Sequence, residues 1–212
     1  MRKQFNAEGI CFAKEHYMVN LDSRIMEIRK LIADGKYFTI NKARQYGKTT
    51  TLSKLKENLE DKYIVFSISF EGIGDKAYLN EENFCRLFCG LLYDAIYYKE
   101  VTGVSEEIEA VCKQISEDKN RSVDFREMSN FITKMCQEIE RPVVLIIDEV
   151  DQASNQKIFL DFLGMLRAKY LKRNSRLTFV SVILASVYDI KNLKQKIRTE
   201  EKHQYNSPWN IA

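Results

Sequence analysis

The segment YFTINKARQYGKTT, residues 37–50, contains residues whose types and spacing suit phosphate binding. Gly47, Lys48 and Thr49 match the end of the pattern G-x-x-x-x-G-K-[ST], but Lys42 stands where that pattern has its first glycine. Gly47 permits close approach of the backbone. Lys48 can reach the β- and γ-phosphates, and the Thr49 hydroxyl can ligate magnesium. The segment therefore predicts a phosphate-binding loop with an altered first turn.

A second motif, RPVVLIIDEVD (141–151), strengthens this prediction, because a Gly-Lys-Thr triplet alone occurs by chance. In phosphate-loop enzymes a buried strand ends in an acidic residue that fixes magnesium beside the loop. A following glutamate can act as general base toward water. Asp148 and Glu149 occupy these two positions. The alternative is an ordinary acidic turn in which Asp151 or Ser154 caps the next helix, and for Asp151 this capping role is preferred.

Strands and helices alternate in the predicted secondary structure. The predicted strands are 37–41, 63–70, 143–148 and 178–186. The last two are nearly continuous Val- and Ile-rich runs, which is typical of strands covered on both faces. The predicted helices are 23–35 with Gly35 as its C-terminal cap, 49–62, 81–100, 123–140 and 155–173. The alternation predicts an α/β fold with a parallel sheet.

The candidate loop lies between the first predicted strand, which ends at Asn41, and the helix that begins near residues 47–50. This is the context that the motif requires. The dipole at a helix N-terminus favours negative charge, and its free backbone amides can donate to phosphate oxygens. Lys42 and Arg44 can add positive charge nearby.

The composition is that of an ordinary globular domain. The 212 residues are 45% hydrophobic and 11% aromatic, which is enough for one large core. The net charge of +3 arises from 33 basic and 30 acidic residues, a balance that neither requires nor excludes nucleic acid. No apolar run approaches the length of a membrane span.

The cysteines are predicted to be buried thiols in a reducing cytoplasm. The chain opens MRKQFNAEG, without an apolar signal peptide, and its cysteines are odd in number and scattered. A metal site would need further ligands, and the only histidines are His16 and His203. The cysteines are Cys11, Cys85, Cys89, Cys112 and Cys136.

The segments 37–50, 143–151 and 181–194 together resemble the AAA-ATPase-like domain family. The resemblance runs over nearly the whole chain, from HYMVNLDSRI through SFEGIGD to YNSPWNIA. Loops of this family often lack the first glycine and carry Arg-Gln before Gly-Lys-Thr, as Arg44 and Gln45 do here. The resemblance implies a three-layer P-loop NTPase with helices on both faces of a mainly parallel sheet. It is of the additional-strand type, with strand order 5-1-4-3-2.

The resemblance also implies an ATPase with ATP and Mg²⁺ as cofactors and with Walker A and Walker B motifs. Glu149 and Lys48 are the expected catalytic residues, and Thr49 and Asp148 are expected to hold magnesium. Ser186 is the expected polar sensor of the γ-phosphate, since Ser181 lies too early along its strand. The expected nucleotide-binding residues are Ala43, Arg44, Gln45, Tyr46, Gly47, Lys48, Thr49, Thr50, Tyr17 and Ser186.

The sequence allows two interpretations of the role of several further residues. Tyr17, with His16, resembles the stretch that brackets adenine in related ATPases, and a core aromatic is the alternative. Glu71 follows the second strand on the ligand side of such a sheet, where it contacts water or a neighbouring subunit, or caps a turn. The candidates for an arginine that stabilises phosphoryl charge, each with a solvated surface charge as the preferred alternative, are Arg167, Arg173 and Arg198.

Longer family members commonly continue into a PD-(D/E)XK nuclease-like domain. Residues 1–212 are therefore expected to be an AAA-like ATPase domain that ends before a C-terminal domain. The apolar Trp209 and Ile211 suit either a truncated domain or a docked tail. The expected partners are ATP and an attached or separate protein domain, with a homo-oligomer as an option, nucleic acid reached only indirectly and no membrane. The alternatives are a slow nucleotide-dependent switch and a small-molecule kinase, and ATP is preferred over GTP because no N-K-x-D motif is present.

Overall fold

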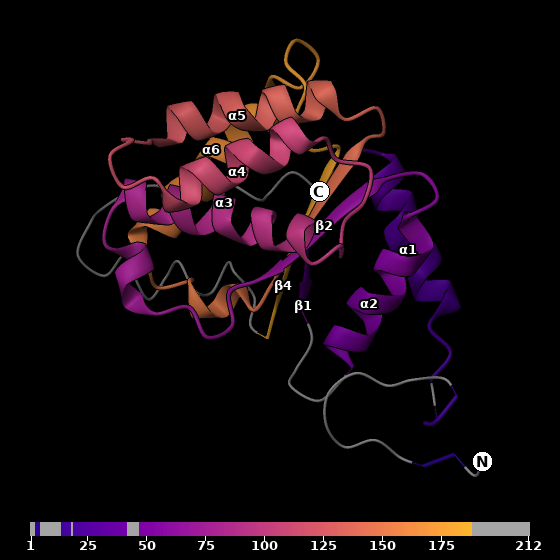
Figure 1. Ribbon diagram of the computed structural model, residues 1–212. Helices are drawn as coiled ribbons and strands as arrows, with labels where there is room; N and C mark the ends of the chain where they lie inside the picture. Colours follow the sequence, from indigo (N-terminus) through magenta and orange to yellow (C-terminus); the bar gives the residue numbers. More distant parts are fainter. Residues whose placement is uncertain (1–2, 5–13, 18, 42–46, 188–212) are drawn as a thin grey trace, which may run out of the picture.

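A computed structural model of the chain describes residues 3–4, 14–17, 19–41 and 47–187 (Figure 1). The strands are β1 (Tyr37–Asn41), β2 (Ile64–Ser69), β3 (Val143–Asp148) and β4 (Ser181–Ser186). The helices are α1 (Asp22–Ala33), α2 (Lys48–Leu59), α3 (Glu81–Tyr97), α4 (Glu106–Glu117), α5 (Phe125–Glu138) and α6 (Lys157–Leu171). Two short 3-10 helices are η1 (Asp75–Tyr78) and η2 (Val150–Gln152).

The four strands form one parallel sheet in the order β1-β4-β3-β2. β4 is inserted between β1 and β3, which confirms the additional-strand arrangement. The observed order is the 1-4-3-2 part of the predicted order, and the described residues contain no fifth strand. All four predicted strands are present, although β2 and β4 are shorter than expected.

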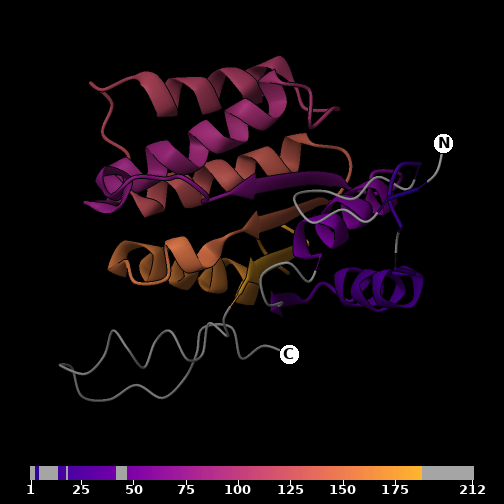
Figure 2. The same ribbon diagram turned by 90° about the horizontal axis from the view of Figure 1, so that it is seen from below.

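The sheet lies between two layers of helices (Figures 1 and 2). Along β3, Val144 and Ile146 belong to the apolar cluster with α1 and α2, whereas Leu145 and Ile147 belong to the cluster with α3, α5 and α6. Alternate residues of a strand point to opposite faces, so an unbroken apolar run serves both layers. The predicted three-layer α/β fold is confirmed.

Helix α4 was not predicted from the sequence. The side chain of Ser105 caps its N-terminus by accepting a hydrogen bond from the Ile108 amide, and the helix buries only Ile108, Cys112 and Ile115. The helix packs against α3, on the side of α3 away from the sheet (Figure 2). Three buried apolar residues give only a weak helical periodicity in the sequence. Ser105, followed by acidic residues in the first turn, is nevertheless a pattern typical of the start of a helix.

The predicted cap at Gly35 is confirmed. Gly35 has φ +65° and donates to the carbonyl of Ile32, while Lys36 donates to that of Leu31. These two bonds form a Schellman motif, whose left-handed position glycine occupies at low cost.

The described cysteines are buried free thiols, as predicted, and Cys11 lies outside the described residues. Burial raises the pKa of Cys85, Cys112 and Cys136 to about 12 and raises that of Cys89 as well. A thiol with a raised pKa is a poor nucleophile at neutral pH. These side chains therefore serve as apolar packing groups.

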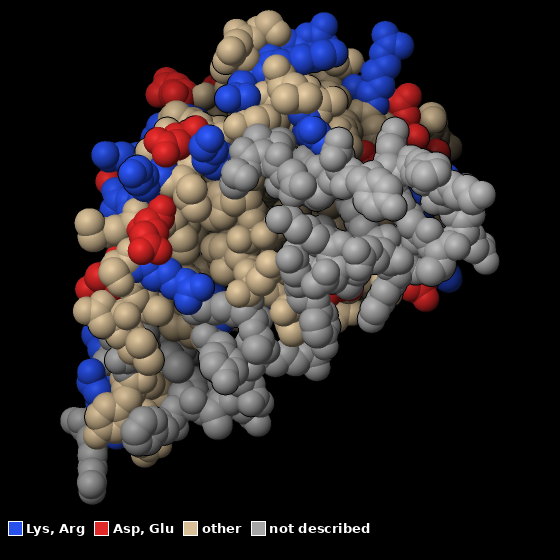
Figure 3. All heavy atoms as spheres, turned by 180° about the vertical axis from the view of Figure 1, so that it is seen from behind, with Lys and Arg blue, Asp and Glu red and all other residues tan. Residues whose placement is uncertain are grey.

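On the face shown in Figure 3, the described Lys and Arg side chains are interspersed with Asp and Glu around an area of other residues. This mixture agrees with the nearly balanced charge of the sequence. Within the part of the chain that the structure describes, no helix combines the length and apolar character needed to cross a membrane.

Candidate phosphate-binding and acidic site

The first part of the site is the N-terminus of α2. Gly47 is the N-cap residue with φ +70°, and its carbonyl accepts hydrogen bonds from the amide and the hydroxyl of Thr51, at 2.9 and 2.7 Å. This left-handed conformation is one that glycine adopts readily. Lys48 and Thr50 then turn into the protein, whereas Thr49 is exposed and accessible to a ligand.

The second part is the turn after β3. Asp148 ends the strand, and the Glu149 amide donates to Asp148 Oδ1 at 2.8 Å. Glu149 has φ +54°, a left-handed conformation that costs a residue with a Cβ about 1–2 kcal/mol. Val150 and Ala153 are fully buried and anchor the turn that follows. Such stored strain is common at functional sites.

The two parts meet at Lys48. Its Nζ lies 2.6 Å from Asp148 Oδ1 and 2.5 Å from Glu149 Oε1. The Lys48 side chain is only 8% exposed, and those of Asp148 and Glu149 are 15% and 22% exposed. Burial lowers the pKa of Lys48, but the hydrogen bonds and the negative charges of the two carboxylates together outweigh burial, so the pKa is raised overall. A protonated lysine therefore sits between two acidic groups.

The residues at this point suit magnesium. Asp148 and Glu149 lie close enough together to share one cation, the Lys48 ammonium, and Thr49 is an exposed residue with a hydroxyl at the same helix end. Mg²⁺ prefers oxygen ligands, and waters and substrate phosphates usually occupy several of its coordination positions. One carboxylate and one hydroxyl are therefore enough ligands from the protein. The described residues contain no larger group of His, Cys, Asp and Glu that could hold a metal ion.

Ser186 lies at the predicted position, at the end of β4, but it is buried and already bonded. Its Oγ donates to Asn41 Oδ1 at 2.9 Å. Asn41 ends β1 and immediately precedes residues 42–46, so this pair connects the strand β4 to the beginning of the candidate loop. Sequence reasoning missed Asn41, although its place at a strand end beside the motif was visible. The Ser181 hydroxyl donates to the Lys36 carbonyl at the other end of β4.

The capping role predicted for Asp151 and Ser154 is wrong. Helix α6 begins at Lys157 with Gln156 as its N-cap, and no side chain caps it. The physical reason is that Asp151 lies inside the 3-10 turn η2 and Ser154 lies in the turn that follows it, so both precede the N-cap residue Gln156. The Asp151 carboxylate instead accepts a hydrogen bond from the Val187 amide at 2.9 Å.

The family model of the AAA-like domain matches residues 12–196. This chain belongs to the AAA-like domain family. Its membership identifies it as a P-loop ATPase domain by family. A comparison with curated proteins gave no match.

Among solved structures, Cdc6p from Pyrobaculum aerophilum is similar to this AAA-like domain. The two share 12% sequence identity with a TM-score of 0.49, and the alignment covers 84% of this chain and 43% of that chain. The AAA-like domain therefore spans less than half the length of that protein.

Several predicted nucleotide-binding residues of the AAA-like domain lie outside the described residues, as do Lys42, His203, Trp209 and Ile211. They are Ala43, Arg44, Gln45 and Tyr46, together with the arginine candidate Arg198. The described part of the predicted site is therefore the helix end, the acidic turn, Ser186 and Tyr17.

Of the other two arginine candidates, Arg173 is far from the site of its own chain. Its guanidinium stacks on the ring of Tyr170 at 3.9 Å, and Tyr170 in turn packs on Tyr37, with ring centroids 4.6 Å apart. Tyr37 is the first residue of β1, whereas Lys48 lies beyond the last residue of that strand. Arg173 therefore occupies the opposite edge of the sheet. Arg167 is half-buried on α6.

Tyr17 and Glu71 are the remaining residues for which the sequence left two interpretations. Tyr17 is 52% exposed, so the core-aromatic alternative is wrong, and its amide donates to the Gln4 carbonyl at 3.0 Å. His16 forms an isolated bridge with Gln4. Glu71 is exposed and its amide donates to Ser69 Oγ at 3.1 Å. Ser69 is paired with Asp148, which places Glu71 near the carboxyl edge of the sheet, as predicted.

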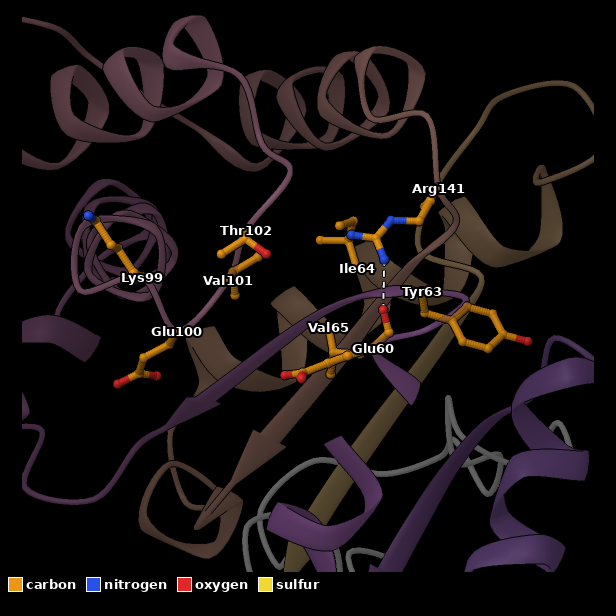
Figure 4. A pocket seen from close by; sticks show the side chains of 9 residues that line it. All are labelled: Glu60, Tyr63, Ile64, Val65, Lys99, Glu100, Val101, Thr102 and Arg141. Atoms are coloured by element: carbon orange, nitrogen blue, oxygen red, sulfur yellow. Dashed lines mark hydrogen bonds between the residues drawn. The ribbon is translucent and has the colours of Figure 1, made fainter. Parts of the chain in front are cut away.

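A pocket of about 150 Å³ lies at the opposite, amino edge of the sheet (Figure 4). Arg141, just before β3, crosses it to donate to the Glu60 carbonyl at 2.7 Å, and Ile64 at the start of β2 forms part of its wall. Ligands of open α/β sheets bind at the carboxyl ends of the strands. The pocket is therefore separate from the site around Lys48.

Proposed function

We propose that this AAA-like domain binds ATP with magnesium and hydrolyses it, and that the cycle drives a conformational change in an attached or partner domain. The observation that carries the proposal is the meeting of Lys48, Asp148 and Glu149 within hydrogen-bond distance. It joins a helix N-terminus, which attracts phosphate, to a strand end that offers two carboxylates. Both parts are needed for phosphoryl transfer to water.

Lys48 and the amides of α2 would hold the β- and γ-phosphates. The lysine is a point charge on a flexible stem, so its ammonium can leave the carboxylates and turn toward phosphate oxygens without movement of the helix. Thr49 and Asp148 would hold magnesium, which supplies neutralisation of the charge on the β- and γ-phosphate oxygens. The nucleotide-binding roles of residues 43–46, Thr50, Tyr17 and Ser186 belong to the same proposal.

Glu149 would orient the attacking water and accept its proton. Its carboxylate is partly exposed and lies beside Asp148, which places a base close to the proposed magnesium ligand. The left-handed turn fixes the direction in which this side chain leaves the strand. A carboxylate in this position supports water as the phosphoryl acceptor rather than a small-molecule substrate.

A slow nucleotide-dependent switch is the second candidate. The Lys48 ammonium pairs with the same Glu149 that would act as base, so the base becomes available only when the lysine moves to phosphate. Further positive charge on the γ-phosphoryl group could come from Arg198, from an attached domain or from a neighbouring subunit. An arginine supplied by a neighbour would make turnover per chain increase with protein concentration.

Two measurements on the wild-type chain test the proposal. Calorimetry with ATP and magnesium should show saturable binding, and a phosphate-release assay without an added acceptor should show turnover. Binding without phosphate release would favour the switch, and release that depends on an added small-molecule acceptor would favour a kinase. A chain that binds no ATP would overturn the proposal altogether.

A further inference from the structure

Asp151 fastens the turn that carries Glu149 to the end of β4. Its Oδ1 lies 2.9 Å from the amide nitrogen of Val187, the residue that follows β4. The pairing of β3 with β4 stops at Ile147 and Leu184, so Val187 lies beyond the last main-chain partner that β3 provides. The carboxylate of Asp151 takes the place of that partner.

The linkage continues to the next strand. Ser186, adjacent to Val187, donates to Asn41 at the end of β1, and residues 42–46 of the candidate loop follow directly. The ends of β3, β4 and β1 are thus joined, in that order, by two side-chain hydrogen bonds on one edge of the sheet. That edge is where Lys48 meets the acidic pair.

Asp151 belongs to the same tight turn as Glu149. The Gln152 amide donates to the Glu149 carbonyl at 3.0 Å, and both the amide and the hydroxyl of Ser154 donate to the Asp151 carbonyl, at 3.3 and 2.7 Å. Glu149 is strained, with φ +54°, and a strained residue keeps its conformation only where its surroundings fix it. Fixing Asp151 to β4 fixes the turn two residues from Glu149.

Building on the proposed function, we infer that Asp151 is a positioning residue that keeps the Glu149 carboxylate in place beside Lys48 and the N-terminus of α2. It acts through the backbone of the turn, because its side chain bonds to Val187 rather than to Lys48. This role requires an acceptor oxygen at the position of Asp151 Oδ1 and does not require a negative charge. Asparagine, which keeps a carbonyl oxygen at that place, should therefore replace Asp151.

The test compares kcat, KM and the calorimetric Kd for ATP in Asp151→Ala, Asp151→Asn and Asp151→Glu. The control is Asp161→Ala, which removes an exposed carboxylate from α6. We expect Asp151→Ala to lower kcat about 10-fold or more with the Kd for ATP within about 3-fold, because a displacement of about 1 Å at a reacting group can cost about 100-fold. Asp151→Asn should recover most of kcat. Asp151→Glu keeps the charge but displaces the oxygen, so its kcat should stay low, and Asp161→Ala should match the wild type.

A wild-type kcat in Asp151→Ala, or an equal loss in Asp151→Asn and Asp151→Ala, would overturn the inference. Equal losses of kcat and ATP affinity would do the same, since they would mark general damage to the site. Should Asp151→Ala fail to fold, Asp151→Asn and Asp151→Glu still make opposite predictions. Amide hydrogen exchange at Val187, fast in Asp151→Glu and slow in Asp151→Asn, tests the linkage without turnover. An inactive wild type with this exchange pattern would overturn the proposed ATPase and leave the structural linkage standing.

Discussion

The Nζ of Lys48 lies 2.5 Å from Oε1 of Glu149. The cation expected to bind phosphate and the carboxylate expected to activate water are therefore each other's partners in this structure. A nucleotide that attracts the lysine would release the glutamate in the same movement. Under the proposed function, this coupling would make the base available only when ATP is bound, and the first two predictions test the two residues separately.

Replacing Lys48 with alanine should weaken ATP binding about 100-fold. Hydrogen bonds to charged groups contribute about 1.5–3 kcal/mol each, and 1.4 kcal/mol corresponds to a factor of ten. Lys54→Ala is the matched control, since Lys54 lies on the same helix but pairs with Asp22 at 2.8 Å. Calorimetry with ATP and magnesium measures both variants. Unchanged ATP affinity in Lys48→Ala would mean that Lys48 does not bind the phosphates and that the phosphate-loop assignment is wrong.

Glu149→Gln should separate binding from chemistry. The amide keeps the size of the side chain but cannot accept a proton, so kcat should fall about 100-fold or more while the Kd for ATP stays close to the wild-type value. The control is Glu140→Gln, which neutralises an exposed carboxylate before β3. If phosphate release by Glu149→Gln equals that of the wild type, Glu149 is not the base and the switch interpretation gains.

The regular part of the fold was predictable from the sequence. Strands such as β3 are continuous apolar runs, and a parallel sheet must bring their carboxyl ends to one edge. The meeting of Lys48 with Asp148 and Glu149 follows from that topology once each residue is placed at the end of its element. The pattern of the motifs therefore contained most of the geometry of this site.

The contacts that join neighbouring elements were not predictable. The hydrogen bond from the Val187 amide to the Asp151 carboxylate links residues 36 positions apart in the chain, and that from Ser186 to Asn41 links residues 145 apart. Each depends on the exact length of a strand and the direction of a turn. A short-range rule assigned Asp151 to a helix cap, because capping patterns are read from adjacent residues only.

Gly47→Ala should lower both stability and ATP affinity. A left-handed conformation costs a residue with a Cβ about 1–2 kcal/mol, and no described atom lies within 4 Å of a Cβ built at Gly47, so the stability cost is conformational. The added methyl group would also obstruct approach of phosphate to the backbone. Gly164 is an exposed residue in the middle of α6. Gly164→Ala should instead raise the free energy of unfolding by about 0.5–1 kcal/mol without changing ATP affinity. Urea unfolding and calorimetry measure both quantities, and a loss of stability in both variants would contradict this account.

Lys169 is a buried cation without an acidic partner among its described contacts. Its side chain, 8% exposed, donates to the Ser129 carbonyl at 2.7 Å and to Thr133 Oγ1 at 2.6 Å, between α5 and α6. Burial lowers its pKa to about 8, and Arg176 acts in the same direction while Cys136 acts against it. The folded protein therefore binds this proton less tightly than the unfolded chain does, in which the lysine has its ordinary pKa of about 10.5.

Lys169→Met should stabilise the protein at pH 7 by about 1–2 kcal/mol, since one pKa unit corresponds to about 1.4 kcal/mol and some solvent remains near the amine. Thr133 Oγ1 also donates to the Ser129 carbonyl, so the substitution leaves that acceptor satisfied. Below pH 8 Lys169 is protonated in the folded wild type, so the buried charge lowers the free energy of unfolding by its full amount. Between pH 8 and 10.5 the unfolded chain binds the extra proton, so the wild type gains stability as the pH rises and the advantage of Lys169→Met should shrink.

The measurement is the difference in unfolding free energy between the two proteins in urea at pH 7 and pH 9.5. The buried thiols, whose pKa values are raised, weaken both proteins above about pH 9, and for Cys85 and Cys112 this effect cancels in the difference. Lys169 lowers the pKa of Cys136, so Lys169→Met raises that pKa further, and this change also shrinks the advantage of the variant at pH 9.5. Lys172→Met, which removes an exposed lysine just after α6, should differ from the wild type by less than about 0.5 kcal/mol at both pH values. A Lys169→Met variant that is less stable than the wild type at pH 7 would mean that the hydrogen bonds to α5 outweigh the cost of burying the charge.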